Sequence, residues 1–396
     1  MNSKNNNLFS KLKNLNFALE LLYFSLIPLY QKFLLFFYPI FVVKILKFKL
    51  VKKPFTRLQV CNLLLIAYIL LHDYYFLRFS FETIRAASPF VLFFIFSFLS
   101  YNLLALKKIK NLLYAVFYVN FLAIGIQILF NTNFKGEEIN YFSSAYHSLG
   151  GIYGHPYLSV TLSLVTLAFA YLFQDKRMLI VSIVSLIISS TFRSVLSLFP
   201  IFVAYYLLRQ GFKLYQILST LVLGIFVVLT LIIFDSNYEE YKRCSLDIHT
   251  QKYNQCTVYN SSALRIFAWK SFIDNSSDFY IYGNTEKKEK FKTLNIGANL
   301  DPKEIDQFKI FESPYLQLIA NYGLVALIIY SCMILYLIAI NYKKCNIRGL
   351  SAAHKRKYTL NFVTCCLVLF DSFYGVFFFC SISWLAIFPL IANERS

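Results

Sequence analysis

The sequence predicts an all-α polytopic membrane protein with about twelve transmembrane helices. Of the 396 residues, 58% are hydrophobic and 19% are aromatic, and the mean hydropathy is +0.56. Only 15% of the residues are charged, against roughly 25% in soluble domains. Apolar runs long enough to cross a bilayer as helices recur along the whole chain.

The apolar runs between charge clusters define the expected spans, at about 20 residues each with shorter ones allowed. These spans are residues 17–30, 32–46, 58–77, 87–106, 111–131, 156–173, 178–190, 195–208, 214–234, 315–341, 358–374 and 376–392. The first two could also be one long helix, and Pro28 and Gln31 mark where a hairpin would turn.

The positions of the basic residues favour the hairpin and place both termini in the cytoplasm. The cytoplasmic segments then hold 23 of the 39 Lys and Arg residues, as expected for a membrane protein. The net charge of +19 comes largely from short clusters between apolar runs, such as 44–57 and 107–110. We therefore interpret the charge as membrane topology and expect the lipid bilayer, not a nucleic acid, as the partner.

This topology divides the chain into three parts. Residues 1–234 form a transmembrane bundle of about nine spans, 235–314 a large periplasmic loop, and 315–396 the C-terminal spans. A loop of this length is expected to contain short helices and to have a function. Within it, residues 261–274 have the apolar spacing of an amphipathic helix at the membrane surface.

The cysteines predict one possible disulfide and no metal site. Cys244 and Cys256 both lie in the large loop, where an oxidising compartment would allow them to pair. No spacing of Cys, His and carboxylates indicates a metal site, and no phosphate-binding or dinucleotide motif is present. We therefore expect no metal and no cofactor.

Three arginines are candidates for binding an anionic group. Arg193 is the only charged residue between Met178 and Leu208, and it lies in a predicted turn between two short spans. Arg265 lies in the amphipathic stretch, and Arg85 lies in a predicted short outer loop, 78–86. Each could simply be solvated or extend to the interface. Together, their guanidinium groups could hold a diphosphate leaving group.

Two further residues are candidates for acid–base chemistry. His155 lies in GGIYGHPYLS, where glycines and a proline interrupt the chain before a span, and it could bind a sugar or move a proton. Glu312 lies where the large loop re-enters the membrane, and it could act as a general base on an acceptor hydroxyl. A structural role for either residue is the plainer alternative.

Three segments together resemble the Wzy-type O-antigen polymerase and O-antigen ligase superfamily of bacterial inner membranes. These segments are GHPYLS, STFRSVLSL, and a large loop that runs from ALRIFAWKSF through YGN to ESPYLQLIANYGLVAL. The resemblance covers roughly residues 140–340. It implies a metal- and nucleotide-independent glycosyltransfer at the periplasmic face, in which Arg193 and Arg265 hold the pyrophosphate.

The resemblance also implies the partners of the reaction. These are an undecaprenyl-pyrophosphate-linked oligosaccharide donor and a lipid-linked acceptor, with a chain-length regulator protein as a further candidate. Ligases of this family typically have a His-Asn pair where this chain has Glu312-Ser313. This departure favours a polymerase of O-antigen or capsule, with ligase as the alternative. A flippase is a weaker alternative because few charges lie within the spans.

Overall fold

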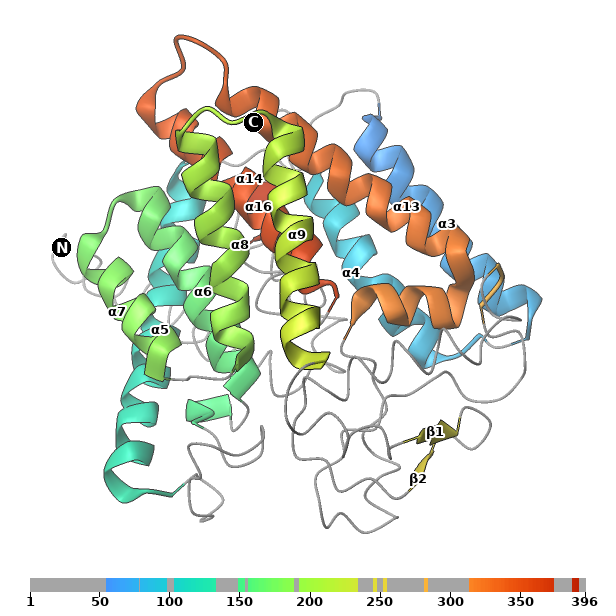
Figure 1. The fold of residues 1–396 in the computed structure, drawn as a ribbon, viewed down its shortest axis with the longest axis horizontal. Helices are drawn as coiled ribbons and strands as arrows, with labels where there is room; N and C mark the ends of the chain where they lie inside the picture. The colour runs from blue at the N-terminus through green and yellow to red at the C-terminus, as the bar shows by residue number, and fades with distance from the viewer. Residues whose placement is uncertain are drawn as a thin grey trace, which may run out of the picture.

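The computed structural model shows a bundle of helices (Figure 1). The described residues are 55–77, 79–97, 103–132, 149–153, 156–188, 192–233, 245–247, 252–254, 281–283, 313–373 and 387–391. Nearly all of the regular structure in these residues is helical, as the sequence predicts. The predicted spans 17–30 and 32–46 and the predicted helix 261–274 lie outside the described residues.

The elements follow the apolar runs closely. They are α3 (Arg57–Tyr75), α4 (Phe81–Ser97), α5 (Leu103–Phe130), the 3-10 turn η1 (Gly151–Tyr153), α6 (Pro156–Phe173), α7 (Lys176–Ile188), α8 (Phe192–Arg209), α9 (Leu214–Ile233), β1 (Ser245–Asp247), β2 (Lys252–Asn254), α13 (Pro314–Cys345), α14 (Ala352–Asp371) and α16 (Phe388–Ile391). β1 and β2 form a short antiparallel hairpin, the one non-helical addition to the predicted class within the described residues.

Three described helices are long and apolar enough to cross a membrane, namely Arg57–Tyr75, Ile109–Phe130 and Pro314–Cys345. Four shorter apolar helices accompany them, at Ala86–Ser97, Leu158–Phe173, Ser197–Arg209 and Leu214–Val227. These lengths fit a helical membrane protein. The total of twelve spans and the side on which each loop lies remain predictions.

The boundary between the predicted spans 87–106 and 111–131 is wrong. We expected the lysines at 107–110 to form a loop, but α5 begins at Leu103 and continues through them. Lysine is a good helix former, and its ammonium can extend from a helix to the interface. The ammonium of Lys110 lies 5.2 Å from the ring centroid of Tyr114 and 5.1 Å from that of Phe173, where it gains cation–π contact.

Hydroxyl side chains allow α6 and α7 to pack closely. Ser163 and Ser185 are fully buried, and their hydroxyls lie 2.9 Å apart across the two helices. The Ser163 and Thr166 hydroxyls also donate to carbonyls one turn earlier in α6. Small hydroxylated residues let helix backbones approach in a membrane, where apolar contact alone gives no preference for protein over lipid.

The helix α13 is broken by one glycine. Gly323 has φ +76° and ψ −174°, which is non-helical, and it divides α13 into a short part from Pro314 and a long part that ends at Cys345. Figure 1 shows the short part turning away at an angle from the end of the long part, and α13 packs beside α3 and α14. Ser313 caps the short part, since its hydroxyl accepts from Leu316 N at 3.2 Å.

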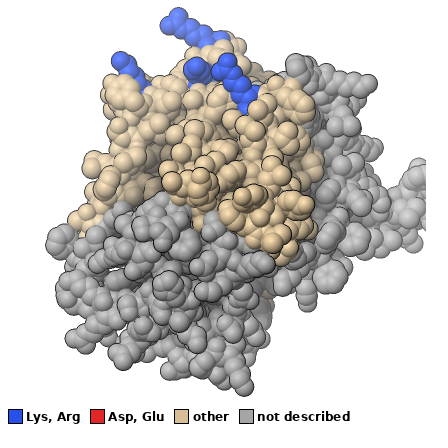
Figure 2. All heavy atoms as spheres, turned by 90° about the vertical axis from the view of Figure 1, so that its right-hand side faces the viewer, with Lys and Arg blue, Asp and Glu red and all other residues tan. Residues whose placement is uncertain are grey.

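The basic segments of the described chain meet at one end of the bundle, which we call the basic end. The Tyr342 hydroxyl donates to Phe212 O at 3.0 Å, and Arg209 bonds to the Tyr205 hydroxyl at 2.9 Å. Figure 2 shows Lys and Arg side chains along the upper edge of this face, with no acidic residue among the described ones there. We call the opposite end, where α3 and α14 finish and α8 and α13 begin, the loop end.

Candidate functional site

A buried His-Asp pair lies at the loop end of α3. Asp73 is fully buried, and its two carboxylate oxygens have different partners: Oδ1 lies 3.3 Å from His72 Nδ1, and Oδ2 accepts from the Thr83 hydroxyl at 2.6 Å. The pair therefore joins α3 to the first turn of α4. Ionisable side chains buried in membrane proteins are expensive and commonly belong to a functional site.

The other side of His72 holds a segment of the predicted large loop. His72 Nε2 lies 2.5 Å from the carbonyl oxygen of Tyr282, and the His72 ring also meets the Tyr322 ring edge-on at 5.4 Å. The Tyr68 hydroxyl donates to Tyr322 O at 2.9 Å, one turn earlier on α3. The segment 281–283 is thus held between α3 and the break in α13.

Two glycines make this contact possible. Gly283 (φ +71°) and Gly323 (φ +76°) have left-handed φ values and touch through their backbones. A Cβ on Gly323 would overlap Ile281 O and lie 2.7 Å from Gly283 N, and a Cβ on Gly283 would lie 2.5 Å from Tyr322 N. Only glycine at both positions permits so close an approach of two main chains.

A second junction fastens the start of α13 to the end of α14. The Ser313 hydroxyl donates to Ser372 O at 2.8 Å, and the Tyr330 hydroxyl lies 3.0 Å from the Ser372 hydroxyl. Asp371, the last residue of α14, is 2% exposed. Asp371 is therefore buried at the loop end, next to the serine that anchors α13.

A third junction holds the glycine-rich segment that precedes α6. Asn120 of α5 accepts from Ile152 N and donates to the Ser159 hydroxyl, both at 3.1 Å, and Gln127 accepts from Gly151 N at 3.0 Å. Gly151 has φ +58°, and a Cβ there would lie 2.8 Å from Asn120 Cγ. The segment Gly151–Tyr153 is thus held against α5, and it ends two residues before His155 in the sequence.

The end of α7 packs on this segment as well. Ile188 packs against buried Leu149 and Ile124. Further along, Phe199 of α8 lies 5.7 Å from Phe370 of α14, ring to ring, so α8 begins at the loop end near the end of α14. Elements adjoining each of the three sequence motifs therefore converge at the loop end.

The structure changes the placement of two predicted arginines. Arg193 is the second residue of α8, in its first turn, and not within the turn that we expected between the two helices. Arg85 lies in α4, which begins at Phe81, and not in a loop at 78–86. The Ser80 carbonyl accepts from Thr83 N, and an acid at position 82 suits a helix start, so α4 begins earlier than its apolar run suggests.

The remaining predicted site residues lie outside the described residues. These are Glu312, His155, Arg265, Cys244 and Cys256. β1 begins one residue after Cys244, β2 ends two residues before Cys256, and Ser245 pairs with Asn254. The disulfide stays a prediction. Within the described residues, no three His, Cys, Asp or Glu side chains gather as metal ligands would.

Sequence reasoning missed the His72–Asp73 pair. The signal was present, because these two titratable residues are adjacent inside the predicted span 58–77. Their partners could not be found in the same way, since Tyr282 and Tyr322 are more than 200 residues away and are ordinary aromatic residues of a loop and a span.

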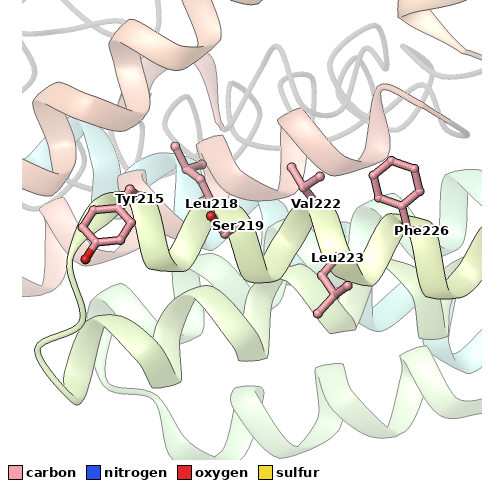
Figure 3. A pocket seen from close by; sticks show the side chains of 6 residues that line it. All are labelled: Tyr215, Leu218, Ser219, Val222, Leu223 and Phe226. Atoms are coloured by element: carbon pink, nitrogen blue, oxygen red, sulfur yellow. The ribbon is translucent and has the colours of Figure 1, made fainter.

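An open apolar groove runs along α9 (Figure 3). It has a volume of about 500 Å³ and is lined by Tyr215, Leu218, Ser219, Val222, Leu223 and Phe226. These residues recur every three or four positions, so most of them share one face of the helix. The groove contains one hydroxyl besides that of Tyr215 and no charge, and it suits hydrocarbon better than water.

A bundle of apolar helices with ionisable residues collected at one end is typical of integral membrane enzymes and transporters. In a comparison with family models, residues 162–331 match the family described as O-antigen ligase (Wzy_C). The match places this part of the chain in the O-antigen ligase/Wzy superfamily, which confirms the resemblance seen in the sequence. Comparison with curated proteins gives no match.

Proposed function

We propose that this protein is a polysaccharide polymerase of the bacterial inner membrane. It transfers a growing glycan from undecaprenyl pyrophosphate to the non-reducing end of another lipid-linked repeat unit at the periplasmic face. The product is an O-antigen or a capsule. The observation that carries the proposal is the family match over residues 162–331, because this range includes Arg193, Arg265 and Glu312.

The chemistry needs a held leaving group and a base. The acceptor hydroxyl oxygen bonds to the anomeric carbon of the donor as the bond from that carbon to the pyrophosphate oxygen breaks. The pyrophosphate leaves with the bonding electrons, and Arg193 and Arg265 neutralise its charge, with Arg85 as a third cation. Glu312 takes the hydroxyl proton, and His155 binds the acceptor sugar or relays that proton.

The positions of the described residues that adjoin Arg193 and Glu312 support this arrangement. Arg193 lies in the first turn of α8 at the loop end, Glu312 directly precedes Ser313, and Ser313 is fastened to Ser372. The groove on α9 offers apolar surface that could hold the hydrocarbon of a lipid-linked substrate. All the energy of the transfer then comes from the donor, so no cytoplasmic nucleotide is needed.

The second candidate is an O-antigen ligase, which moves the finished glycan to lipid A-core or to a protein. The description of the matched family favours it. Glu312-Ser313 in place of the ligase's His-Asn pair favours the polymerase, and Ser313 serves here as the cap of α13. Deletion of the gene followed by gel analysis of surface polysaccharide separates the two. A single repeat unit on the core indicates a polymerase, whereas lipid-linked long chains with a bare core indicate a ligase.

The arginines give a direct test of the mechanism. Arg193→Ala or Arg265→Ala should lower transfer by about 10²–10³-fold, because each removes a donor that stabilises the leaving group. Complementation of the deletion strain, scored by polysaccharide gel at matched protein levels, measures this effect. Arg177→Ala, an exposed arginine at the basic end, is the control. Long chains of normal abundance in both the Arg193→Ala and the Arg265→Ala variants would refute the role in binding the diphosphate.

A further inference from the structure

The His72–Asp73 pair has no part in the proposed transfer step, although it is a buried pair of titratable side chains in an apolar bundle. A buried carboxyl–imidazole pair is a weak source of stability, because removing the two groups from water offsets most of what they gain from each other. Asn or Ser side chains could anchor a loop without that penalty. The His72–Asp73 pair is therefore best explained by the main-chain segment that its imidazole holds in place.

The partners of His72 fix its proton on one side. The Tyr282 carbonyl oxygen can only accept a hydrogen bond, so His72 Nε2 must carry a hydrogen and donate it. Nδ1 then faces Asp73 Oδ1, and the Thr83 hydroxyl holds the other carboxylate oxygen at 2.6 Å. Thr83 therefore orients Asp73, Asp73 orients the imidazole, and the imidazole holds the main chain at Tyr282.

The held segment lies in the part of the sequence that carries the proposed chemistry. Arg265 lies on one side of residues 281–283 and Glu312 lies on the other. Holding residues 281–283 divides the long connection between α9 and α13 into two shorter connections. Less conformational entropy is then lost when Arg265 or Glu312 takes its position in the site. The backbone contact between Gly283 and Gly323 fixes the same point against α13.

We propose that His72 is a positioning residue. With Asp73 and Thr83, it holds residues 281–283 on the break in α13, and this contact sets the pose of the large loop in which the glycan is transferred. The inference rests on the proposed function for its consequence in the cell. The docking of the loop itself can be measured without any glycan.

His72→Gln and His72→Asn test this role, because both introduce a side-chain amide but the two side chains differ in length. The side-chain amide nitrogen of Gln lies near the place of Nε2, whereas that of Asn lies near the place of Nδ1. His72→Gln therefore keeps a donor for Tyr282 O, and His72→Asn loses it. Tyr68→Phe, which removes only the hydroxyl bond to Tyr322 O, is a milder change at the same junction.

The first measurement is trypsin cleavage of the purified full-length protein in lipid nanodiscs. Lys287, Lys288, Lys290 and Lys292 provide cleavage sites shortly after the held segment. We expect His72→Asn to be cleaved there at least about tenfold faster than the wild type, as for loss of about 1.4 kcal/mol or more of docking free energy. His72→Gln should be cleaved at the wild-type rate, and Tyr68→Phe at an intermediate rate.

The second measurement is the abundance of long glycan chains in the complemented deletion strain. His72→Asn should lower it by about 10²-fold through misplacement of the reacting groups, and His72→Gln should restore it. Wild-type cleavage in both His72→Asn and Tyr68→Phe would overturn the docking. Fast cleavage with normal glycan would overturn the positioning role, provided that Arg265→Ala abolishes long chains. If gene deletion itself leaves the glycan unchanged, the proposed function fails, while the cleavage result still decides the docking.

Discussion

The break in α13 gives the sharpest prediction of stability. Gly323→Ala adds one methyl group at a residue with φ +76° and ψ −174°, a conformation that is nearly exclusive to glycine and costs other residues about 1–3 kcal/mol. The new Cβ would also overlap Ile281 O and lie 2.5 Å from Ile281 C, where ordinary contacts between carbon atoms are about 3.5–4.0 Å.

Relief of this overlap requires residues 281–283 to move away by about 1 Å, on the same contact distances. That movement separates Tyr282 O from His72 Nε2 and leaves a buried donor without its acceptor, which costs about 1–3 kcal/mol more. We therefore expect Gly323→Ala to destabilise the protein by about 2–6 kcal/mol, the sum of the two ranges.

Substitutions at two other glycines separate the cost of backbone strain from the cost of the steric overlap. Gly349 has φ +81°, and no atom lies within 4 Å of the point that a Cβ would occupy, so Gly349→Ala should cost only the backbone strain of about 1–2 kcal/mol. Gly125 lies inside α5 in open space, and Gly125→Ala should stabilise by about 0.5–1 kcal/mol. Thermal unfolding of the detergent-solubilised full chain at one scan rate ranks the three variants. Equal losses for Gly323→Ala and Gly349→Ala would refute the close contact between the loop and α13.

Two further predictions concern other parts of the bundle. Burial, with the neighbouring Lys344 charge second, lowers the pKa of Lys357 from its ordinary 10.5 to about 8, so the unfolded state binds more protons between these values. Stability should therefore rise with pH from about 8 to 10.5, by at most about 3 kcal/mol. In thermal scans, Lys357→Met should remove this rise of stability with pH. Lys355 is an exposed neighbour, and Lys355→Met should retain the rise. The same rise in both variants would contradict the assignment to Lys357. Asn120→Leu removes the hydrogen-bond acceptor of Ile152 N and should lower the stability by about 1–3 kcal/mol. Thr220→Val, on the exposed face of α9, is the control and should change the stability by less than about 0.5 kcal/mol. Similar shifts of the melting temperature for the two variants would contradict the role of Asn120.

The sequence was sufficient for the class of protein and for most helices, because lipid-spanning helices must be long and apolar. The α6 range 156–173 agrees with its predicted span at both ends, and α9 differs from its own by one residue. The order of three motifs also resembled the O-antigen ligase/Wzy superfamily, and the match over residues 162–331 confirmed that resemblance for this part of the chain. Helix ends near charges were less predictable, because Lys and Arg are good helix formers whose charged ends can reach the interface.

The tertiary structure decided which residues meet. The largely apolar stretch from Tyr315 to Ile340 gives no clear reason to expect a break, since glycine is common in transmembrane helices. The Ile281–Gly283 main chain lies against the break at Gly323, and that approach joins residues about 40 positions apart. The His72–Asp73 pair was visible as two titratable residues in an apolar run, but its task was not. What His72 holds depends on a carbonyl more than 200 residues away, and only the folded chain brings the two together.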